Sequence, residues 1–283
     1  MIEIIDSHLH FFALDEGHYG WLKPQNPPHW PDKHKLVRSV SESDLQLHEP
    51  LSLAGFVHIE AGFDNTKPWR EIDWLAQHCQ RPYAAVAFWD LLAAEAEQTL
   101  EALLQRPKVS GVRYILDDDG VAILSHPLIA QRFALLQEAG LGFDVQLPLS
   151  ATASVQALLS LIRQFPGVRF IINHAGFPFH DTHSQNPWRQ SLNELAKSPN
   201  VAIKLSGWEM QDRQWSKESV RHVMAYVLDV FGHERVMLGS NFPLCLWHSS
   251  YKDFWQTMVS LVAPDTRNQV ACTNARHWYQ ISG

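Results

Sequence analysis

The stretch MIEIIDSHLHFF (residues 1–12) changes character within a few positions. It begins as an apolar strand pattern, Ile-Glu-Ile-Ile, and becomes polar from Asp6 onward. Because side chains alternate across a strand, His8 and His10 share one face while Leu9 points to the other. The stretch therefore predicts a first β-strand whose carboxyl end presents two imidazoles. They are either buried groups hydrogen-bonded to backbone or the beginning of an active site.

Downstream of this strand, short apolar runs alternate with longer helical patterns. Further strand patterns lie at residues 53–62, 83–91, 109–116, 142–148, 168–176, 200–208 and 235–241. Helical patterns lie at residues 69–79, 93–105, 128–140, 150–166, 187–197, 217–232, 251–263 and 266–279. A doubly wound open sheet would show the same local alternation, so the count of eight strand patterns is the argument for closure. The sequence predicts an α/β fold, a single-domain (β/α)8 TIM barrel over residues 1–283.

Local signals mark helix ends and one long loop. Gly140 and Gly232 are expected to end two of the helices. Thr266 and Gln269 have capping-box spacing at the beginning of the last helix. Residues 11–33 are rich in aromatic residues and proline and have no sustained period. A loop of this length in a compact chain is usually functional.

Charge and composition exclude several classes of partner. Lys and Arg total 23 against 30 Asp and Glu, a formal net charge of −7, so we expect no nucleic-acid partner. No apolar run approaches the roughly 20 residues of a membrane helix, and the N-terminus has no signal-peptide pattern. The 3 cysteines are widely spaced and fit no complete disulfide framework. We expect a cytoplasmic monomer or homodimer that acts on a small molecule.

Polar residues cluster at the carboxyl ends of the apolar runs. They are His8, His10, His58, Glu60, Asp90, Arg113, Asp144, Gln146, His174, Lys204, Ser206, Ser240 and Asn241. In an α/β barrel these ends meet at one mouth, where catalytic groups are gathered from several strands. The scattered residues are therefore expected to form one constellation.

Six segments in order also carry a family resemblance. They are IDSHLHF (5–11), FVHIEAG (56–62), GVRYIL (111–116), INHAGFP (172–178), IKLSGW (203–208) and MLGSNFP (237–243). In order and spacing they resemble the amidohydrolase-related (amidohydrolase 2) family, in the branch of TIM-barrel hydrolases with sugar-acid lactonases and pyrone-dicarboxylate lactonase. The resemblance implies a (β/α)8 barrel and a hydrolase that opens small cyclic esters. It places His8, His10, His174 and the eighth-strand position in the active site.

The chain departs from the family pattern at two metal-related positions. Metal-dependent members generally have a His at the end of the fifth strand and an Asp at the end of the eighth. Those places correspond here to Asp144 or Gln146 and to Asn241. Catalytic zinc commonly takes three protein ligands and a water, so His8 and His10 would need a third group. We expect at most a weakly bound divalent metal (Zn or Mn) at His8 and His10, with no metal as the alternative.

Arg113 and His174 are the candidates for handling the substrate carbonyl. A planar guanidinium holds a carboxylate or a carbonyl oxygen through two donors, which favours substrate orientation and oxyanion stabilisation by Arg113. A salt bridge to an acid such as Asp117 is the structural alternative. His174 precedes Ala-Gly, where small residues allow close approach. As a neutral imidazole it could donate to the carbonyl or shuttle protons, or it could support other site residues.

Asn241 raises the question of the catalytic base. The lactonases usually keep an Asp at this position, as the group that activates water, and the chain has GSNFP instead. An amide has almost no basicity and can only orient the water. Glu60, Asp144 or a histidine could take the proton instead. The alternative is that the chain has lost its base and merely binds its ligand.

The remaining mouth residues are candidates for substrate binding. His58, Glu60, Gln146, Lys204 and Trp208 form this group, although a slip of one residue in register would exchange the faces of the strands. Structural hydrogen-bonding layers are the alternative. Four tryptophans in loops after strands would together give an apolar wall suited to a small ring: Trp21, Trp30, Trp208 and Trp247.

Three functional hypotheses follow from these residues. The first is a hydrolase in which water attacks the ring carbonyl of a small lactone or related cyclic ester. The second is a metal-dependent carbon-carbon lyase, because related barrels decarboxylate aromatic acids. The third is a catalytically silent binding protein.

Overall fold

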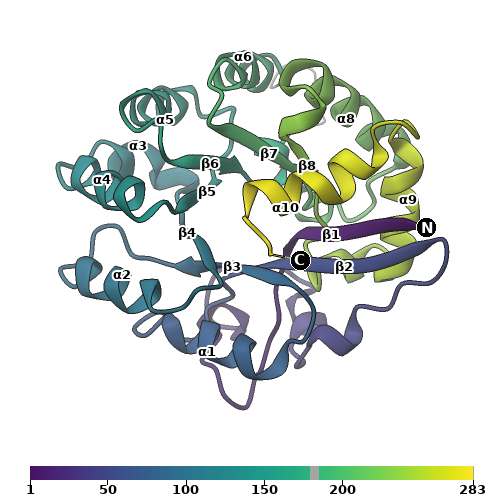
Figure 1. The fold of residues 1–283 in the computed structure, drawn as a ribbon, viewed down its shortest axis with the longest axis horizontal. Helices are drawn as coiled ribbons and strands as arrows, with labels where there is room; N and C mark the ends of the chain where they lie inside the picture. The colour runs from purple at the N-terminus through teal and green to yellow at the C-terminus, as the bar shows by residue number, and fades with distance from the viewer. Residues whose placement is uncertain (179–184, 283) are drawn as a thin grey trace.

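Eight parallel strands form one sheet whose spatial order follows the chain (Figure 1). The computed structural model describes residues 1–178 and 185–282. The strands are β1 (Ile2–Leu9), β2 (Leu51–Ile59), β3 (Tyr83–Phe88), β4 (Val109–Ile115), β5 (Gly142–Gln146), β6 (Arg169–Ile172), β7 (Val201–Leu205) and β8 (Val236–Leu238). Each pairs in parallel with the next along the chain. The eight predicted strands are therefore confirmed.

Backbone hydrogen bonds close the barrel at the carboxyl ends of its first and last strands. The Asn241 amide donates to the His8 carbonyl over 2.8 Å, and the His10 amide donates to the Phe242 carbonyl over 2.7 Å. These bonds join the end of β1 to the chain that follows β8. The closed barrel predicted from the count of strand patterns is confirmed, and its seam lies beside the first-strand imidazoles.

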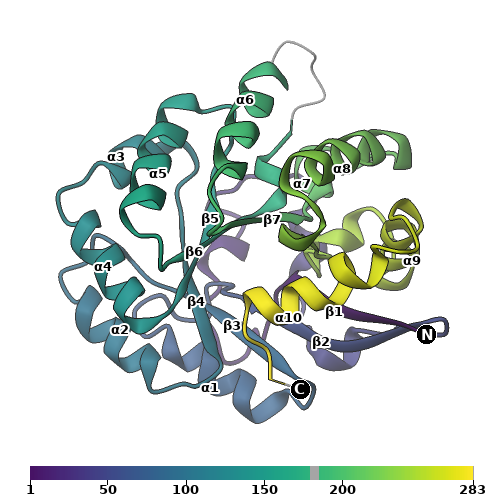
Figure 2. The same ribbon diagram turned by 45° about the horizontal axis from the view of Figure 1, so that its top comes forward.

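Helices lie around the strands on the outside of the barrel, and the last of them lies across one end of it (Figures 1 and 2). They are α1 (Trp69–His78), α2 (Ala96–Leu104), α3 (Gly120–Leu124), α4 (Ile129–Ala139), α5 (Thr152–Gln164), α6 (Gln185–Ala196), α7 (Trp208–Gln211), α8 (Lys217–Phe231), α9 (Tyr251–Leu261) and α10 (Asn274–Trp278). Gly140 adopts a left-handed φ of 67° and ends α4 as expected, because glycine reaches this conformation without strain. Gly232 likewise ends α8, and its amide donates to the Leu228 carbonyl. In the described part of the chain, no helix has the length and apolar character needed to cross a bilayer.

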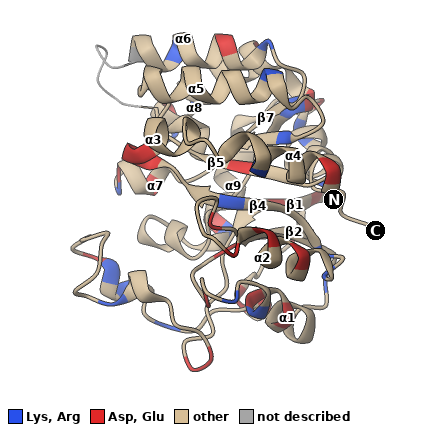
Figure 3. Cartoon of the chain, turned by 90° about the vertical axis from the view of Figure 1, so that its left-hand side faces the viewer, with Lys and Arg blue, Asp and Glu red and all other residues tan. Residues whose placement is uncertain are grey.

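The last helical segment closes the amino end of the barrel. A π-helical turn (Gln269–Thr273) leads into α10 and packs against β1 and β8. Trp278 and Tyr279 belong to a buried apolar cluster with strand residues such as Val57 and Met237. Both chain ends lie on one side of the barrel, opposite α7 (Figure 3). This plug leaves the carboxyl ends of the strands as the mouth.

The predicted capping box at the beginning of this segment is wrong. The Thr266 hydroxyl donates to the Ala263 carbonyl, and the Gln269 amide donates to the Asn274 side chain. No side chain caps the π-helical turn. Both side chains are engaged by other groups and do not bond each other's backbone.

A register irregularity in β1 sets the direction of the first-strand imidazoles. Ile5 packs in the cluster that Trp278 and Tyr279 join, which fills the barrel interior, and Asp6 bonds outward to Tyr251 on α9. Strict alternation would therefore turn residue 8 outward with residue 6. The pairing of β1 with β2 shifts between Asp6 and Leu9, and His8 faces inward toward β7. An irregularity of this kind re-aims side chains beside many active sites.

Candidate active site

Three imidazoles gather at the mouth of the barrel. The His8 and His10 rings lie 5.1 Å apart, centroid to centroid, and His8 and His174 lie 4.5 Å apart. His8 and His174 are buried and His10 is 7% exposed. Burial lowers the pKa of all three well below the usual histidine range, and the positive charge of Arg113 lowers each further. The three rings are therefore neutral at pH 7, and the predicted constellation of His8, His10, His174 and Arg113 is brought together.

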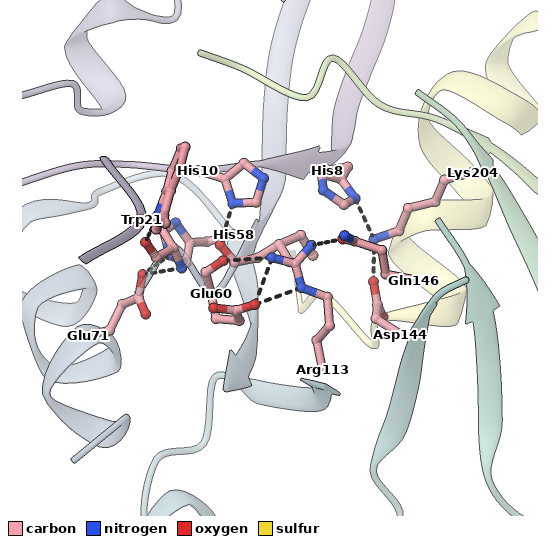
Figure 4. A network of polar contacts seen from close by, with 12 residues as sticks. His8, His10, Trp21, His58, Glu60, Glu71, Arg113, Asp144, Gln146 and Lys204 are labelled. Carbon is pink, nitrogen blue, oxygen red and sulfur yellow. Dashed lines mark hydrogen bonds and ion pairs between the residues drawn. The ribbon is translucent and has the colours of Figure 1, made fainter. Parts of the chain in front are cut away.

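Hydrogen bonds give His10 a definite tautomer. Its Nδ1 lies 2.8 Å from the Ile59 carbonyl, which can only accept, so Nδ1 carries the proton (Figure 4). Nε2 of the neutral ring then has a lone pair. The Ile59 bond, and after it the nearby Asn241 side chain, raise the His10 pKa partway back. His10 can therefore accept a hydrogen bond at the mouth.

Lys204 gives His8 the opposite tautomer. The Lys204 ammonium lies 3.4 Å from His8 Nδ1. Burial lowers the Lys204 pKa to about 8 although Asp144 opposes the shift, so the group stays charged at pH 7 and can only donate. His8 Nδ1 must accept, and the proton of the neutral ring lies on Nε2. That Nε2 is buried and has no partner among the described residues.

A buried ion pair fixes Lys204 below the mouth. Its ammonium donates to Asp144 over 2.6 Å, and both side chains are fully buried. The Tyr279 hydroxyl, from the C-terminal plug, donates to the same carboxylate over 2.9 Å. Both oxygens of Asp144 thus accept from protein donors. Lys204 acts on His8 from below, while the substrate-binding role predicted for it stays a prediction.

Arg113 is held by Glu60 and Gln146 across the mouth. Its Nε donates to Glu60 Oε1 over 2.8 Å, and its Nη1 donates to Gln146 Oε1 over 3.0 Å (Figure 4). The ion pair with Glu60 is only about 6% exposed on either side. Burial raises the pKa of Glu60, and the Arg113 charge opposes that rise. The acid that pairs with Arg113 is therefore Glu60, where the sequence had suggested Asp117.

His58 lies apart from this group. Its Nε2 meets Glu71 of α1 at 2.9 Å, and its Nδ1 accepts from the Phe11 amide at 3.3 Å. Phe56, on the same face of β2, packs in the cluster between strands and helices. Both ring nitrogens of His58 are engaged by protein groups. His58 therefore contacts α1, whereas Glu60, the first residue after β2, pairs with Arg113 at the mouth.

The backbone around His174 is left-handed at several non-glycine positions. His174 and Ala175 have φ values of 55° and 52°, in a short 3₁₀ turn that follows β6. His174 Nδ1 lies 3.0 Å from the Ser206 hydroxyl. A Cβ on Gly207 would lie 2.2 Å from the same nitrogen, so only glycine fits there. Strained backbone of this kind persists where the surroundings enforce it, often at functional sites.

Asn241 bonds a buried acid that the sequence did not single out. Its Nδ2 donates to Glu209 Oε1 over 2.6 Å. Glu209 is fully buried in α7, and burial raises its pKa to about 7 although the Asn241 bond opposes the rise. Its Oε2 and Asn241 Oδ1 have no hydrogen-bond partner among the described residues. The available signal was the acid in SGWEM directly after β7, which no strand or helix period marks.

Three of the four loop tryptophans form a cluster beside the mouth. The Trp21 and Trp30 rings lie 6.3 Å apart, and Trp30 and Trp247 lie 5.2 Å apart. The Arg213 guanidinium lies 3.7 Å from the Trp247 ring centroid and bonds Asp32. Trp208 is buried elsewhere, in a pocket with Trp215.

The donor set does not fit a divalent metal. Within the described residues, no group of three His, Cys, Asp or Glu side chains has the arrangement of a metal site. His8 turns an N–H toward the mouth, and the Lys204 ammonium on its other nitrogen opposes a change of tautomer. Asp144 and Glu60, the predicted nearby acids, are taken by Lys204 and Arg113. A metal at His8 and His10 would have neither Asp144 nor Glu60 available as a third ligand or as a source of negative charge.

A closed parallel barrel with a buried polar ring at the carboxyl ends of its strands defines an enzyme of the TIM-barrel class. The model of the family described as Amidohydrolase matches residues 5–281, so the chain belongs to the amidohydrolase family. The predicted family and hydrolase class are thereby confirmed.

Individual relatives agree with this assignment. The chain is 28% identical over 294 residues to an L-fucono-1,5-lactonase of Burkholderia ambifaria, covering 98% of this chain and 95% of the relative. A zinc-bound amidohydrolase structure from Burkholderia multivorans is 23% identical over 99% of both chains, with a TM-score of 0.82. A 5-carboxyvanillate decarboxylase structure from Sphingomonas paucimobilis is more distant, at 16% identity over 99% of both chains and a TM-score of 0.63. The structural matches show the shared fold.

Proposed function

We propose that the protein hydrolyses a small lactone, in the class of sugar-acid lactones. The observation that carries the proposal is the convergence of Arg113 and three neutral imidazoles on one mouth. Lactone opening needs hydrogen-bond donors where negative charge develops on the carbonyl oxygen. The similarity to a named L-fucono-1,5-lactonase supports the substrate class.

The carbonyl oxygen would lie between Arg113 and His8. His8 Nε2–H is a buried donor without a protein partner in the described chain, and Arg113 supplies a positive charge fixed by Glu60 and Gln146. Such donors are already oriented before reaction, so they stabilise the developing oxyanion without reorganisation. His174 beside His8 would contact the same carbonyl or the ring oxygen. Gln146 and the cluster of Trp21, Trp30 and Trp247 would contact the remainder of the ring.

The finer proposal is that turnover does not require a metal. Two observations support it: His8 presents an N–H to the mouth, and the acids Glu60 and Asp144 are paired with Arg113 and Lys204. Stabilisation of the oxyanion as described above uses protein donors alone. A decarboxylase or a catalytically silent binding protein would not open any lactone in the test below. We further propose a cytoplasmic location, with which the free cysteines Cys79, Cys245 and Cys272 agree, and a monomer or homodimer.

The test is a lactonase assay on purified protein. Proton release would be followed with L-fucono-1,5-lactone, L-rhamnono-lactone, other aldonolactones and a pyrone-dicarboxylate lactone, after dialysis against EDTA and with zinc or manganese added back. We expect ring opening of at least one aldonolactone at a rate that EDTA leaves unchanged. Inertness toward every lactone under all metal conditions would contradict the proposal. Activity only with added metal would contradict the metal-independent mechanism alone.

A further inference from the structure

The inference concerns the group that takes the proton from the attacking water, and it rests on the proposed function. Asn241 cannot act as that base, because an amide has almost no basicity. The acids named from the sequence are unsuited as well: Glu60 holds Arg113, and Asp144 accepts from Lys204 and Tyr279. Another group must therefore take the proton.

Glu209 is distinguished from the other buried carboxylates by a free oxygen. The buried acids of the described chain are Asp6, Glu60, Asp64, Glu71, Asp144 and Glu209. In that set, Glu209 Oε2 is the one carboxylate oxygen that is shielded from solvent and lacks a hydrogen-bond partner. Buried polar atoms are nearly always hydrogen-bonded, so an unpaired acceptor indicates a site for a donor such as water or substrate.

Asn241 links this carboxylate to the mouth. Its Nδ2 donates to Glu209 Oε1 over 2.6 Å, and its backbone amide donates to the His8 carbonyl over 2.8 Å. Its Oδ1 is also unpaired within the described residues and lies on the His10 side. Glu209 Oε2 and Asn241 Oδ1 are thus two buried acceptors without a donor among the described residues. A water molecule has two protons to donate, one for each of them.

We propose that Glu209 is the general base of the lactonase reaction, in place of the eighth-strand carboxylate, with Asn241 positioning it. Glu209 accepts a proton from water as the water oxygen bonds to the lactone carbonyl carbon. The tetrahedral intermediate then breaks its ring C–O bond, and Glu209 returns the proton to the departing ring oxygen. The product is a hydroxy acid, which releases its own carboxyl proton to solvent. Atoms and charge balance without a further reactant.

Electrostatics around Glu209 are compatible with this role. Burial raises the Glu209 pKa to about 7, while the Asn241 bond and the nearby Arg213 charge oppose the rise. Cys245 also lies near Glu209, and burial raises the pKa of that thiol well above its usual range, so the thiol stays neutral. A base works best when its pKa lies near the working pH.

The experiment compares Glu209→Gln, Glu209→Asp and Asp64→Asn across pH 5–9 on the lactone that the wild-type enzyme opens. In the wild type, kcat should rise with pH through an apparent pKa near 7, because only the ionised carboxylate accepts a proton. Glu209→Gln should lower kcat by about 10²–10⁴-fold with little change in KM and abolish this pH dependence. Glu209→Asp should retain part of the rate. Asp64→Asn alters a buried acid that pairs with Arg70, and it should keep the wild-type pH profile.

Two further variants separate a chemical role from a structural one. Glu209→Ala should regain kcat with added formate, which supplies a small carboxylate, but not with chloride at equal ionic strength. Asn241→Asp should move the pH dependence upward, because a second carboxylate beside Glu209 opposes its ionisation. A folded Glu209→Gln enzyme with wild-type kcat and pH profile would overturn the role of Glu209 alone. A wild type inert toward every lactone would overturn the proposed function and this role with it.

Discussion

Arg113 has a structural task at the mouth and, in our proposal, a catalytic one as well. Glu60 occupies one edge of its guanidinium and Gln146 accepts from Nη1. The ion pair is buried, so removal of either partner leaves an uncompensated charge. Loss of activity after a single substitution would therefore mix two effects, and a paired substitution is needed to separate them.

The first residue-scale prediction concerns this pair. Arg113→Met should lower kcat/KM by about 10²–10³-fold, through loss of an oxyanion donor, and should also lower stability by about 3–5 kcal/mol, because Glu60 is left buried and unpaired. The double variant Arg113→Met with Glu60→Gln should recover most of that stability and none of the activity. Urea unfolding and lactonase kinetics measure the two quantities. Recovery of activity in the double variant would exclude Arg113 from the chemistry.

A second residue-scale prediction concerns zinc affinity. The ammonium of Lys204 holds His8 in the tautomer that presents an N–H to the mouth. The double variant Lys204→Met with Asp144→Asn removes that constraint and the positive charge next to His8. Net charge is unchanged, because the buried ion pair is replaced with neutral side chains of similar size. It should bind zinc at least about tenfold more tightly than the wild type, a change of about 1.4 kcal/mol. Calorimetric titration with zinc chloride measures it.

The matched control for zinc binding is the double variant Lys197→Met with Glu194→Gln. Lys197 and Glu194 form an exposed ion pair, so the control also removes one ion pair at unchanged net charge, and it does not touch His8. Equal zinc affinity of the Lys204→Met, Asp144→Asn variant and the wild type would show that Lys204 does not set the ligand properties of His8.

At the scale of elements, strand and helix patterns were predictable and the direction of several side chains was not. Eight strands follow from the alternation of apolar runs, because each strand is buried on both faces and reads as a continuous apolar segment. His8 faces inward only because β1 changes register between Asp6 and Leu9. His58, on a regular part of β2, meets α1 instead of the mouth. A register shift such as the one in β1 does not alter the apolar pattern of the strand, so the direction of His8 could not be predicted from the sequence.

The candidate site was predictable to a similar extent. His8, His10, Arg113 and His174 could be placed at the mouth because they follow strand patterns in order. Glu209 could not, since α7 is a short helix without amphipathic period. Its hydrogen bond with Asn241 joins the chain segments that follow β7 and β8. That contact depends on the conformation of both segments, which the sequence pattern does not predict.

The element-scale prediction concerns the turn after β7. Gly207 has φ of 69°, and an added Cβ would lie 2.2 Å from His174 Nδ1. Gly207→Ala should lower stability by about 2–4 kcal/mol, from left-handed strain and overpacking together, and should lower kcat by moving His174.

Gly140→Ala is the control, because Gly140 has φ of 67° with no atom within 4 Å of the added Cβ. The control should lose only about 1–2 kcal/mol and keep its kcat. Equal losses in stability and activity for both variants would contradict the close packing of His174 against Gly207.

For the whole molecule, the closure of the barrel and the assembly of the site coincide. The seam between β1 and β8 is joined by backbone bonds from His10 and Asn241, both of which line the mouth. Asp6 holds the same seam from outside, accepting from the Ser240 amide over 2.9 Å, the Ser240 hydroxyl and the Tyr251 hydroxyl. A change in the seam should therefore affect fold and activity together.

The prediction at this scale is that Asp6→Asn loosens the seam. An amide offers one acceptor oxygen where the carboxylate offers two, so at least one donor of Ser240 or Tyr251 loses its partner, at about 2–4 kcal/mol in urea unfolding at pH 7. Asp73→Asn, at a partly exposed ion pair with Arg106, should cost less than about 1 kcal/mol.

Burial raises the Asp6 pKa from 3.8 to about 6, so the folded state binds a proton at Asp6 more tightly than the unfolded chain. The contribution of Asp6 protonation to the free energy of unfolding is complete below pH 3.8 and is lost as pH rises through about 6. The stability difference between wild type and Asp6→Asn should accordingly be larger at pH 4 than at pH 7, and a difference independent of pH would contradict this account of the seam.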